Sequence, residues 1–381
     1  NQDDILYVKG GASTRMERVT HALLKGADEQ RSSLVRQTVT WDAISLAQPN
    51  RLTWVEIDTD ALANNVRAMR ALLDPDVTLM AVVKADAYGH GALRVARTAL
   101  LNGATHLGVS SLQEALELRD AGVTAPILTM NFTPVHMARQ AIRHNITTTL
   151  YDLSVARAYE RVAQELGKRI RVHIKVDSGM GRLGIMPDEI KSLFRNLMAM
   201  EELQIEGIYT HFSSADVDPD YTSQQLETFK GMVRSVQSAF GARFTYVHAA
   251  NTAATIAHPE ARLRMVRPGL GLYGMHPSDQ VRLPDEFLPV MTWKTTVVQV
   301  KDLPANHPIG YSNTYITESP ERVAVLPVGY GDGFRRAPNH WGEVLLHGQR
   351  APIRGRISME KTVISVDHIP DVSIGDEVVL L

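Results

Sequence analysis

Between about residues 51 and 275, short β-branched apolar runs alternate with longer segments of helical periodicity. The eight runs are 78–83, 106–110, 127–131, 146–150, 172–176, 205–211, 246–250 and 265–268, and a segment long enough for a helix follows each of the first seven. This alternation predicts parallel strands joined by helices, and eight repeats fit a closed (β/α)8 TIM barrel. A doubly wound open sheet is the alternative, because the same alternation would also build it.

Past about residue 276 the helical period disappears, and Gly, Pro and Asp separate short runs at 297–300, 322–328, 343–346, 361–366 and 377–381. Residues 276–381 are therefore predicted to form a mainly β domain, joined by a strand from 51–59 and truncated where its last run stops. Residues 1–30 hold one apolar run and one helical segment, which is too little for a core. Residues 31–50 are polar and predicted to be a linker.

Composition excludes several classes of function. The 381 residues contain no Cys, 40 Lys+Arg and 42 Asp+Glu, so disulfides, thiolate sites and nucleic-acid binding are not expected. The His residues are scattered without a H-E-x-x-H motif, so we predict no metal site. No apolar run reaches the roughly 18 residues of a membrane span. The acidic N-terminus is unlike a signal peptide, and we expect a cytoplasmic location.

Polar residues gather where the predicted strands end. Catalytic groups of such barrels lie at the C-terminal ends of the strands. The residues at these ends are Lys84, Lys175, Asp177, His211, His248, Asn251 and Arg267. Any one of them alone is more often a solvated cap or a hydrogen-bonded filler. Their coincidence on one rim predicts an active site.

Two of these features indicate the chemistry. Lys84 ends the first strand, and a lysine desolvated near other cations becomes a nucleophile toward a carbonyl cofactor. The segment Gly269-Leu-Gly271-Leu-Tyr-Gly274 has the G-x-G-x-x-G spacing. No βαβ helix follows it, so we do not interpret it as a dinucleotide site. A Gly-rich turn after the eighth strand fits a single phosphate instead.

Six motifs carry a family resemblance. They are AVVKADAYGHG (81–91), HIKVDSGMGRLG (173–184), YTHF (209–212), HAANTAAT (248–255), MVRPGLGLYG (265–274) and LPVGYGDGFRR (326–336). Through them, residues 51–381 resemble the bacterial alanine racemases, fold-type III enzymes that use pyridoxal 5'-phosphate. The resemblance implies an isomerase that interconverts L- and D-alanine for peptidoglycan synthesis. It also implies a homodimer whose active sites are completed across the interface.

The resemblance also assigns roles to residues. Lys84 matches the lysine that binds the cofactor covalently and exchanges a proton on one face of the substrate. Tyr330 matches a tyrosine that serves the opposite face and comes from the other subunit. Arg267 matches the arginine at the pyridine nitrogen, and Arg182 one that binds the phenolic oxygen and the substrate. His211 matches a neighbouring imidazole.

Further positions follow from the same resemblance. The phosphate-binding positions are Tyr88, Asn251, Thr252, Gly269 and Leu270. Tyr315 matches a tyrosine at the substrate entrance, Met359 a residue whose backbone holds the substrate carboxylate, and Lys175 a lysine that is often carbamylated. The chain reads Met359-Glu360-Lys361 where the family usually has Met-Asp-Gln. Family members run on beyond the position of Leu381 and carry a further phosphate-contacting tyrosine there, which this sequence does not include.

The chemistry of racemisation agrees with these roles, because a proton must leave Cα on one face and return on the other. Lys and Tyr have pKa values of about 10 and need neighbouring cations to act as bases. Three alternatives remain: a racemase of broader range that accepts serine, a non-catalytic barrel that binds the cofactor, and a decarboxylase. Arg267 and the lack of Cys argue against the last, and Tyr330 and the β domain against the second.

The N-terminal segment has a resemblance of its own. DILYVKGGASTRMERVTHALL, within residues 1–30, is similar to the C-terminal end of the UDP-N-acetylmuramoyl-tripeptide–D-alanyl-D-alanine ligase. This similarity predicts that the chain comes from a ligase–racemase fusion. Such a fusion would couple the synthesis of D-alanine to its use.

Overall fold

The computed structural model describes residues 52–381. The ligase-like segment 1–30 and the linker 31–50 lie outside the described residues. The described part divides into two compact units, one from Val55 to Thr292 and one from Trp293 to Leu381 that also takes in residues 52–54.

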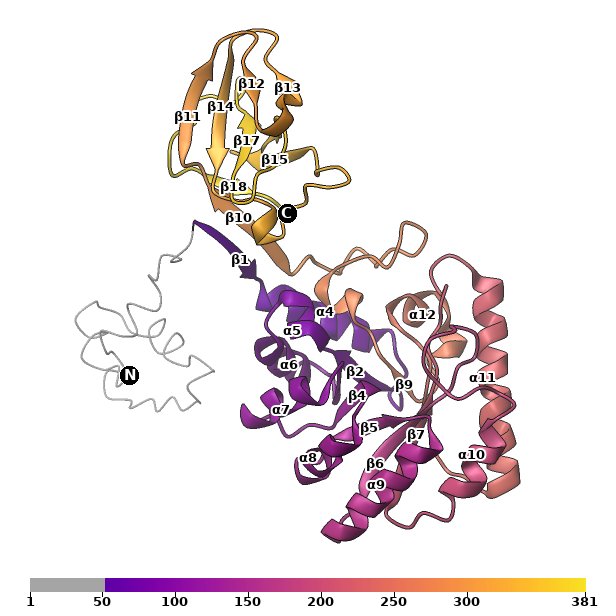
Figure 1. The fold of residues 1–381 in the computed structure, drawn as a ribbon. Coiled ribbons are helices and arrows are strands. Elements are labelled where there is room, and N and C mark those ends of the chain that lie inside the picture. The colour runs from indigo at the N-terminus through magenta and orange to yellow at the C-terminus, as the bar shows by residue number, and fades with distance from the viewer. Residues whose placement is uncertain (1–51) are drawn as a thin grey trace, which may run out of the picture. The chain divides into compact units, whose positions relative to one another are not determined.

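Eight parallel strands close into a barrel in the first unit (Figure 1). The strands are β2 (Thr78–Val82), β3 (His106–Val109), β4 (Ile127–Phe132), β5 (Thr147–Leu150), β6 (Ile170–Lys175), β7 (Leu203–Tyr209), β8 (Tyr246–His248) and β9 (Met265–Val266). Each strand pairs with the next in the chain, and β9 closes on β2 with Met265 opposite Thr78. This confirms the predicted barrel and rules out the open sheet.

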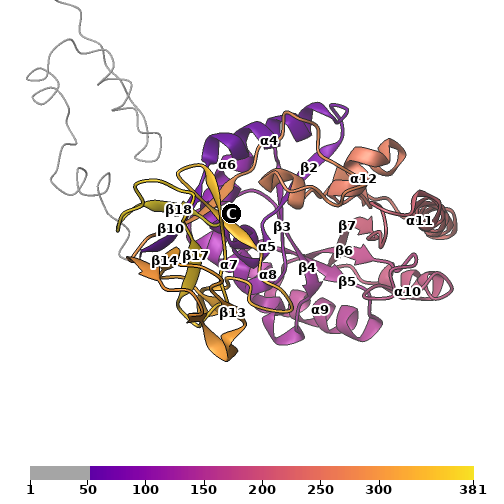
Figure 2. The same cartoon turned by 90° about the horizontal axis from the view of Figure 1, so that it is seen from above.

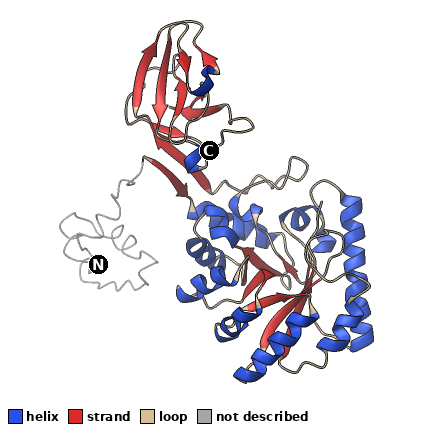
Figure 3. Ribbon diagram, viewed as in Figure 1, coloured by secondary structure: helices blue, strands red, loops and turns tan. Residues whose placement is uncertain are grey.

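Helices surround the barrel strands, as the view in Figure 2 and the colouring of Figure 3 show. They are α4 (Thr59–Ala71), α5 (Lys84–Gly89), α6 (Ala92–Leu101), α7 (Leu112–Asp120), α8 (Ala138–Arg143), α9 (Leu153–Leu166), α10 (Ile190–Leu197), α11 (Pro219–Phe240) and α12 (Thr252–Ala257). Side-chain caps begin several of them: Asp152 accepts a hydrogen bond from the Val155 amide, and Asp218 from that of Tyr221. Helix α4 was not among the predicted segments. None of the described helices has the length and apolarity to cross a membrane.

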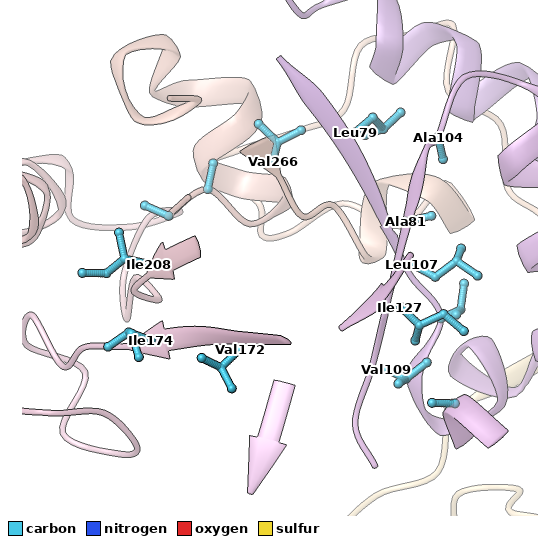
Figure 4. Packing of buried hydrophobic residues seen from close by; sticks show 14 of the residues in the cluster. Leu79, Ala81, Ala104, Leu107, Val109, Ile127, Val172, Ile174, Ile208 and Val266 are labelled. Atoms are coloured by element: carbon cyan, nitrogen blue, oxygen red, sulfur yellow. The ribbon is translucent and has the colours of Figure 1, made fainter. Parts of the chain in front are cut away.

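The barrel strands bury both faces, which explains their nearly continuous apolar sequence. Residues such as Leu79, Leu107 and Ile127 point outward into the layer between strands and helices (Figure 4). Met80 and Met265 lie in a separate cluster. Burying one such side chain contributes about 1.5–3 kcal/mol. Burial of both faces of the strands therefore favours their closure into a barrel.

Residues 276–292 belong to the barrel unit, although we predicted them to begin the β domain. Leu283, Phe287 and Val290 are buried in the barrel core. The Asn65 side chain holds this segment: its Nδ2 donates to the Leu288 carbonyl at 2.7 Å, and its Oδ1 accepts from the Leu288 amide at 2.8 Å. The segment lacks helical periodicity because it packs as an irregular strap, which sequence pattern does not distinguish from a β domain.

The second unit consists of antiparallel sheets. One sheet has the order β1-β10-β18-β15-β16, a second β11-β14-β17, and β12 pairs with β13. The strands are β1 (Thr53–Ile57), β10 (Met291–Thr296), β11 (Gln299–Leu303), β12 (Pro308–Ile309), β13 (Tyr315–Ile316), β14 (Glu321–Leu326), β15 (Glu343–Leu346), β16 (Gln349–Pro352), β17 (Thr362–Ser365) and β18 (Glu377–Val379). The mainly β domain is confirmed. The predicted strand 297–300 instead straddles the point where the chain passes from β10 to β11.

Candidate active site

Lys84 stands at the end of β2, at the start of an unusual turn. Residues 85–88 all have positive φ, from 50° at Ala85 to 57° at Tyr88. A left-handed conformation costs a non-glycine residue about 1–2 kcal/mol, so this turn stores strain. Local hydrogen bonds hold it, including one from the Ala92 amide to Asp86 Oδ1 at 2.6 Å. The turn places Lys84 and Tyr88 on one side of the loop, with the Lys84 amine 5.9 Å from the Tyr88 ring centre.

The environment of the site lowers the pKa of Lys84. Desolvation lowers the pKa of the Lys84 amine, Arg182 lowers it further, and Glu114 opposes both. Burial, Arg267 and Arg182 likewise lower the pKa of Lys175 to about 8. Both amines are therefore more readily available as nucleophiles than an ordinary lysine.

Arg267, which follows β9, is buried and held by neutral acceptors. Its Nη1 donates to His248 Nδ1 at 2.9 Å, and its Nη2 donates to the carbonyls of Thr210 at 2.8 Å and Ala249 at 3.0 Å. The same Nη2 lies 3.2 Å from His211 Nδ1. Burial lowers the pKa of Arg267 to about 10, so the guanidinium keeps its charge at neutral pH.

The arginine also determines the tautomer of His248. A guanidinium only donates hydrogen bonds, so Nδ1 of His248 must accept from Nη1. The hydrogen of His248 then lies on Nε2, which donates to His173 Nδ1 at 2.9 Å. Burial and the charge of Arg267 hold the pKa values of His248 and His211 well below the usual range, so both rings are neutral.

Asp177 shapes the loop that carries Arg182. Its Oδ1 accepts from the amides of Gly179, Met180 and Gly181 at 2.8–3.1 Å, and its Oδ2 from the Arg182 amide at 2.9 Å. Burial raises the pKa of this carboxyl, but the four amide hydrogen bonds outweigh burial and the net pKa is lowered. With its oxygens engaged by backbone, the carboxylate serves to order the loop after β6.

Three of the predicted phosphate-binding positions, Thr252, Gly269 and Tyr88, come together at the barrel mouth. Thr252 Oγ1 accepts from the amides of Gly269 at 3.0 Å and Gly271 at 3.2 Å, just before and within the 3-10 turn Leu270–Tyr273. A Cβ on Gly269 would lie 2.4 Å from the Tyr88 hydroxyl, so glycine lets the two loops meet. Asn251 caps α12 by accepting from the Ala254 amide at 3.0 Å.

These groups fit pyridoxal phosphate. Four cations, Lys84, Lys175, Arg182 and Arg267, share the mouth, and the pKa of Lys175 is influenced by the other three. The hydroxyls of Tyr88 and Thr252 meet at the Gly269 turn and offer donors for a phosphate. A phosphate ester and a phenolate oxygen would meet complementary charge and donors there. Within residues 52–381, no group of three or more His, Asp or Glu side chains is placed to bind a metal ion.

The remaining predicted residues, Tyr315, Tyr330 and Met359, lie in the β domain. The amide of Tyr330 donates to Ser358 O at 3.1 Å, and that of Gly331 to Met359 O at 2.8 Å, which joins the two segments. The Tyr330 ring lies 5.3 Å below the Arg336 guanidinium. The Tyr315 hydroxyl donates to Glu321 at 2.8 Å, so it is engaged within its own domain.

Sequence reasoning overlooked two residues that the structure brings to these sites. Tyr311 lies 5.9 Å from Arg336, is 62% exposed against 41% for Tyr330, and precedes Ser312 and Asn313 at φ 61° and 48°. Glu114 contacts the loop of Lys84. A motif such as GYSNTY signals a strained turn only weakly, and Glu114 looks like an ordinary helix cap.

A closed (β/α)8 barrel with a basic mouth and a following β domain defines a class of two-domain barrel enzymes. The sequence matches the alanine racemase N-terminal domain over residues 57–277 and the alanine racemase C-terminal domain over residues 290–381. The chain therefore belongs to the alanine racemase family and is an isomerase of the pyridoxal-phosphate-dependent kind.

Individual relatives agree with this assignment. Alanine racemase 1 of Oceanobacillus iheyensis is 42% identical over 334 residues, covering 87% of this chain and 88% of the relative. The alanine racemase of Methanococcus maripaludis is 42% identical over 328 residues, covering 85% and 87%. The structure of the Bacillus anthracis alanine racemase with bound L-Ala-P matches with a TM-score of 0.82 at 37% identity, covering 88% of this chain and 86% of that one.

Proposed function

We propose that this chain racemises alanine with pyridoxal 5'-phosphate held in the barrel mouth, and that it supplies D-alanine for peptidoglycan in the cytoplasm. The observation that carries the proposal is the convergence of Lys84, Arg182 and Arg267 on one rim of the barrel, beside Tyr88 and the Gly269 turn. This arrangement offers an amine to a carbonyl group and cations to its anionic substituents.

Each group of the rim has a part in holding the cofactor. When bound, pyridoxal phosphate withdraws electrons from the substrate and makes the hydrogen on Cα acidic. Tyr88, Asn251, Thr252 and the Gly269–Leu270 backbone would hold its phosphate, and Arg182 its phenolic oxygen. Arg267, kept cationic by neutral acceptors, would face the pyridine nitrogen and keep it unprotonated. His211, a neutral imidazole 3.2 Å from Arg267, would lie next to the cofactor.

Racemisation further requires two groups that move protons on opposite faces. Lys84 Nζ would serve one face, because burial and the neighbouring Arg182 lower its pKa. For the other face the resemblance predicts Tyr330, supplied by the second subunit of a homodimer. The structure adds Tyr311 as a competitor, because its ring is more exposed and its turn is strained. The Arg336 guanidinium lies over both rings, 5.9 Å from the centre of Tyr311 and 5.3 Å from that of Tyr330.

The test is solvent exchange. The purified chain with pyridoxal phosphate should incorporate deuterium into alanine from D2O and invert it, starting from either enantiomer, and serine should be processed less well. Lys84→Ala should abolish both exchange and inversion. Full turnover by that variant would refute the proposal, and exchange without inversion would indicate a single base.

The ligase–racemase fusion stays a prediction from residues 1–30. The matches to the racemase family begin at residue 57. Sequencing the gene upstream of Asn1 checks it: a ligase reading frame there would support a fusion, and its absence would end the idea.

A further inference from the structure

Glu114 occupies the third position of α7 and forms a capping box with Ser111. The Ser111 hydroxyl accepts from the Glu114 amide at 3.3 Å, and Glu114 Oε2 accepts from the amides of Ser111 at 3.2 Å and Ser110 at 2.6 Å. A capping box satisfies the free amides at the start of a helix. Here one carboxylate oxygen is sufficient for the box, and the other oxygen is available for a second contact.

That second oxygen crosses to the loop of Lys84. Glu114 Oε1 accepts from the Ala85 amide at 2.7 Å, between residues 29 apart in the chain. Ala85 directly follows Lys84 and opens the left-handed turn, with φ 50°. A carboxylate makes stronger hydrogen bonds to amides than a neutral acceptor does. Glu114 therefore ties the loop after β3 to the strained loop after β2.

The same carboxylate contributes charge. Among the charged groups around the Lys84 amine, Arg182 lowers its pKa and Glu114 raises it. Lys84 in turn affects the pKa values of Lys175 and His211, so all of these groups share one field. Glu114 is the acidic group whose charge acts on Lys84 in this field.

We propose that Glu114 is a positioning residue for Lys84: it fixes the first amide of the left-handed turn and places a negative charge beside the amine. This inference rests on the proposed role of Lys84 as the cofactor-binding lysine. No contact between Glu114 and the cofactor is required. The helix cap and the active-site loop thus depend on one side chain.

The test compares Glu114→Gln with Glu117→Gln in the full chain. Glu117 lies on the exposed side of the same helix, where Gln113 donates to it at 3.1 Å. Amide hydrogen exchange over residues 84–91 should be about tenfold faster in E114Q, because a charged hydrogen bond is lost. The pH midpoint for acetylation of cofactor-free Lys84 by acetic anhydride should fall by about half a unit to one unit. E117Q should change neither.

Glu114→Asp separates the two contributions and provides the test should E114Q fail to fold. Aspartate keeps the charge but is one methylene shorter. Amide hydrogen exchange over residues 84–91 should therefore become faster, while the pH midpoint for acetylation of Lys84 should stay near that of the parent chain. If E114Q matches E117Q in either measurement, the proposal is overturned. Neither measurement depends on turnover, so a failure here is distinct from an active Lys84→Ala, which would instead refute the proposed function.

Discussion

Single carboxylates at the barrel mouth each order the loops around them. Asp177 is the clearest case, because its two oxygens accept four backbone amides of one loop. Glu114 does the same for two loops at once. At this scale the active site depends on residues that need not touch the substrate.

Asp177→Asn should destabilise the chain by about 1–3 kcal/mol near neutral pH, because an amide has one acceptor oxygen and no charge. The folded-state pKa of Asp177 lies below its ordinary value. Its stabilisation is therefore fully present above the unfolded-state pKa of about 3.9 and is lost as pH falls through the folded value. Urea unfolding from pH 7 to pH 3 should show a smaller acid loss in Asp177→Asn. Parallel curves for the two proteins would contradict this role.

At the scale of elements, two of the loops that follow the barrel strands approach each other closely. The turn 85–88 is left-handed over four residues, and the turn at Gly269 approaches it so closely that no Cβ fits beside Tyr88. Loops carry function because a rigid scaffold positions them. The barrel strands are that scaffold, and the strain of the turn is balanced by the packing around it.

Gly269→Ala should weaken pyridoxal phosphate binding by about ten- to a hundredfold, because the new Cβ displaces the Tyr88 hydroxyl from its place 2.4 Å away. Gly231→Ala in α11 is the matched control. No atom lies within 4 Å of its new Cβ, and alanine favours a helix by about 0.5–1 kcal/mol. Absorbance titration with the cofactor and thermal unfolding measure both effects. Equal affinities in the two variants would show that the Tyr88–Gly269 approach is irrelevant to binding.

The whole molecule supplies its candidate bases from two domains. Lys84 belongs to the barrel, whereas Tyr330 and Tyr311 belong to the β domain. If the tyrosine comes from the second subunit, each site needs residues from two chains. An inactive variant of one kind can then be rescued by an inactive variant of the other.

Mixing Lys84→Ala with Tyr330→Phe, and separately with Tyr311→Phe, tests this arrangement. Loss of a general base should lower racemisation by about 10²–10⁴-fold in each pure variant that lacks it. Heterodimers that contain one intact site should then regain activity. The homodimer of each variant, purified alone, should stay inactive. The tyrosine whose variant is inactive and complements Lys84→Ala is the opposite-face base. Failure of both mixtures, with both tyrosine variants inactive, would place the two bases in one subunit.

Sequence was informative wherever the signal is local. The eight barrel strands were predicted because short β-branched apolar runs alternate with segments of helical period, and the position of Lys84 at a strand end follows from that count. Helix α4 and the short strands of the β domain were missed. The strap 276–292 was misassigned, because its anchor Asn65 lies more than 200 residues away in the chain.

The order of strands and helices, the polar rim of the barrel and the family resemblance were thus determined by the sequence itself, because apolar periodicity and motif spacing act over a few residues. Tertiary structure alone decided that Arg267 lies against the neutral rings of His248 and His211, that Glu114 reaches Ala85, and that Tyr311 shares Arg336 with Tyr330. These contacts join residues distant in the chain. Hydrogen bonds and charge interactions of that kind exist only once burial has brought the partners together and removed the water between them.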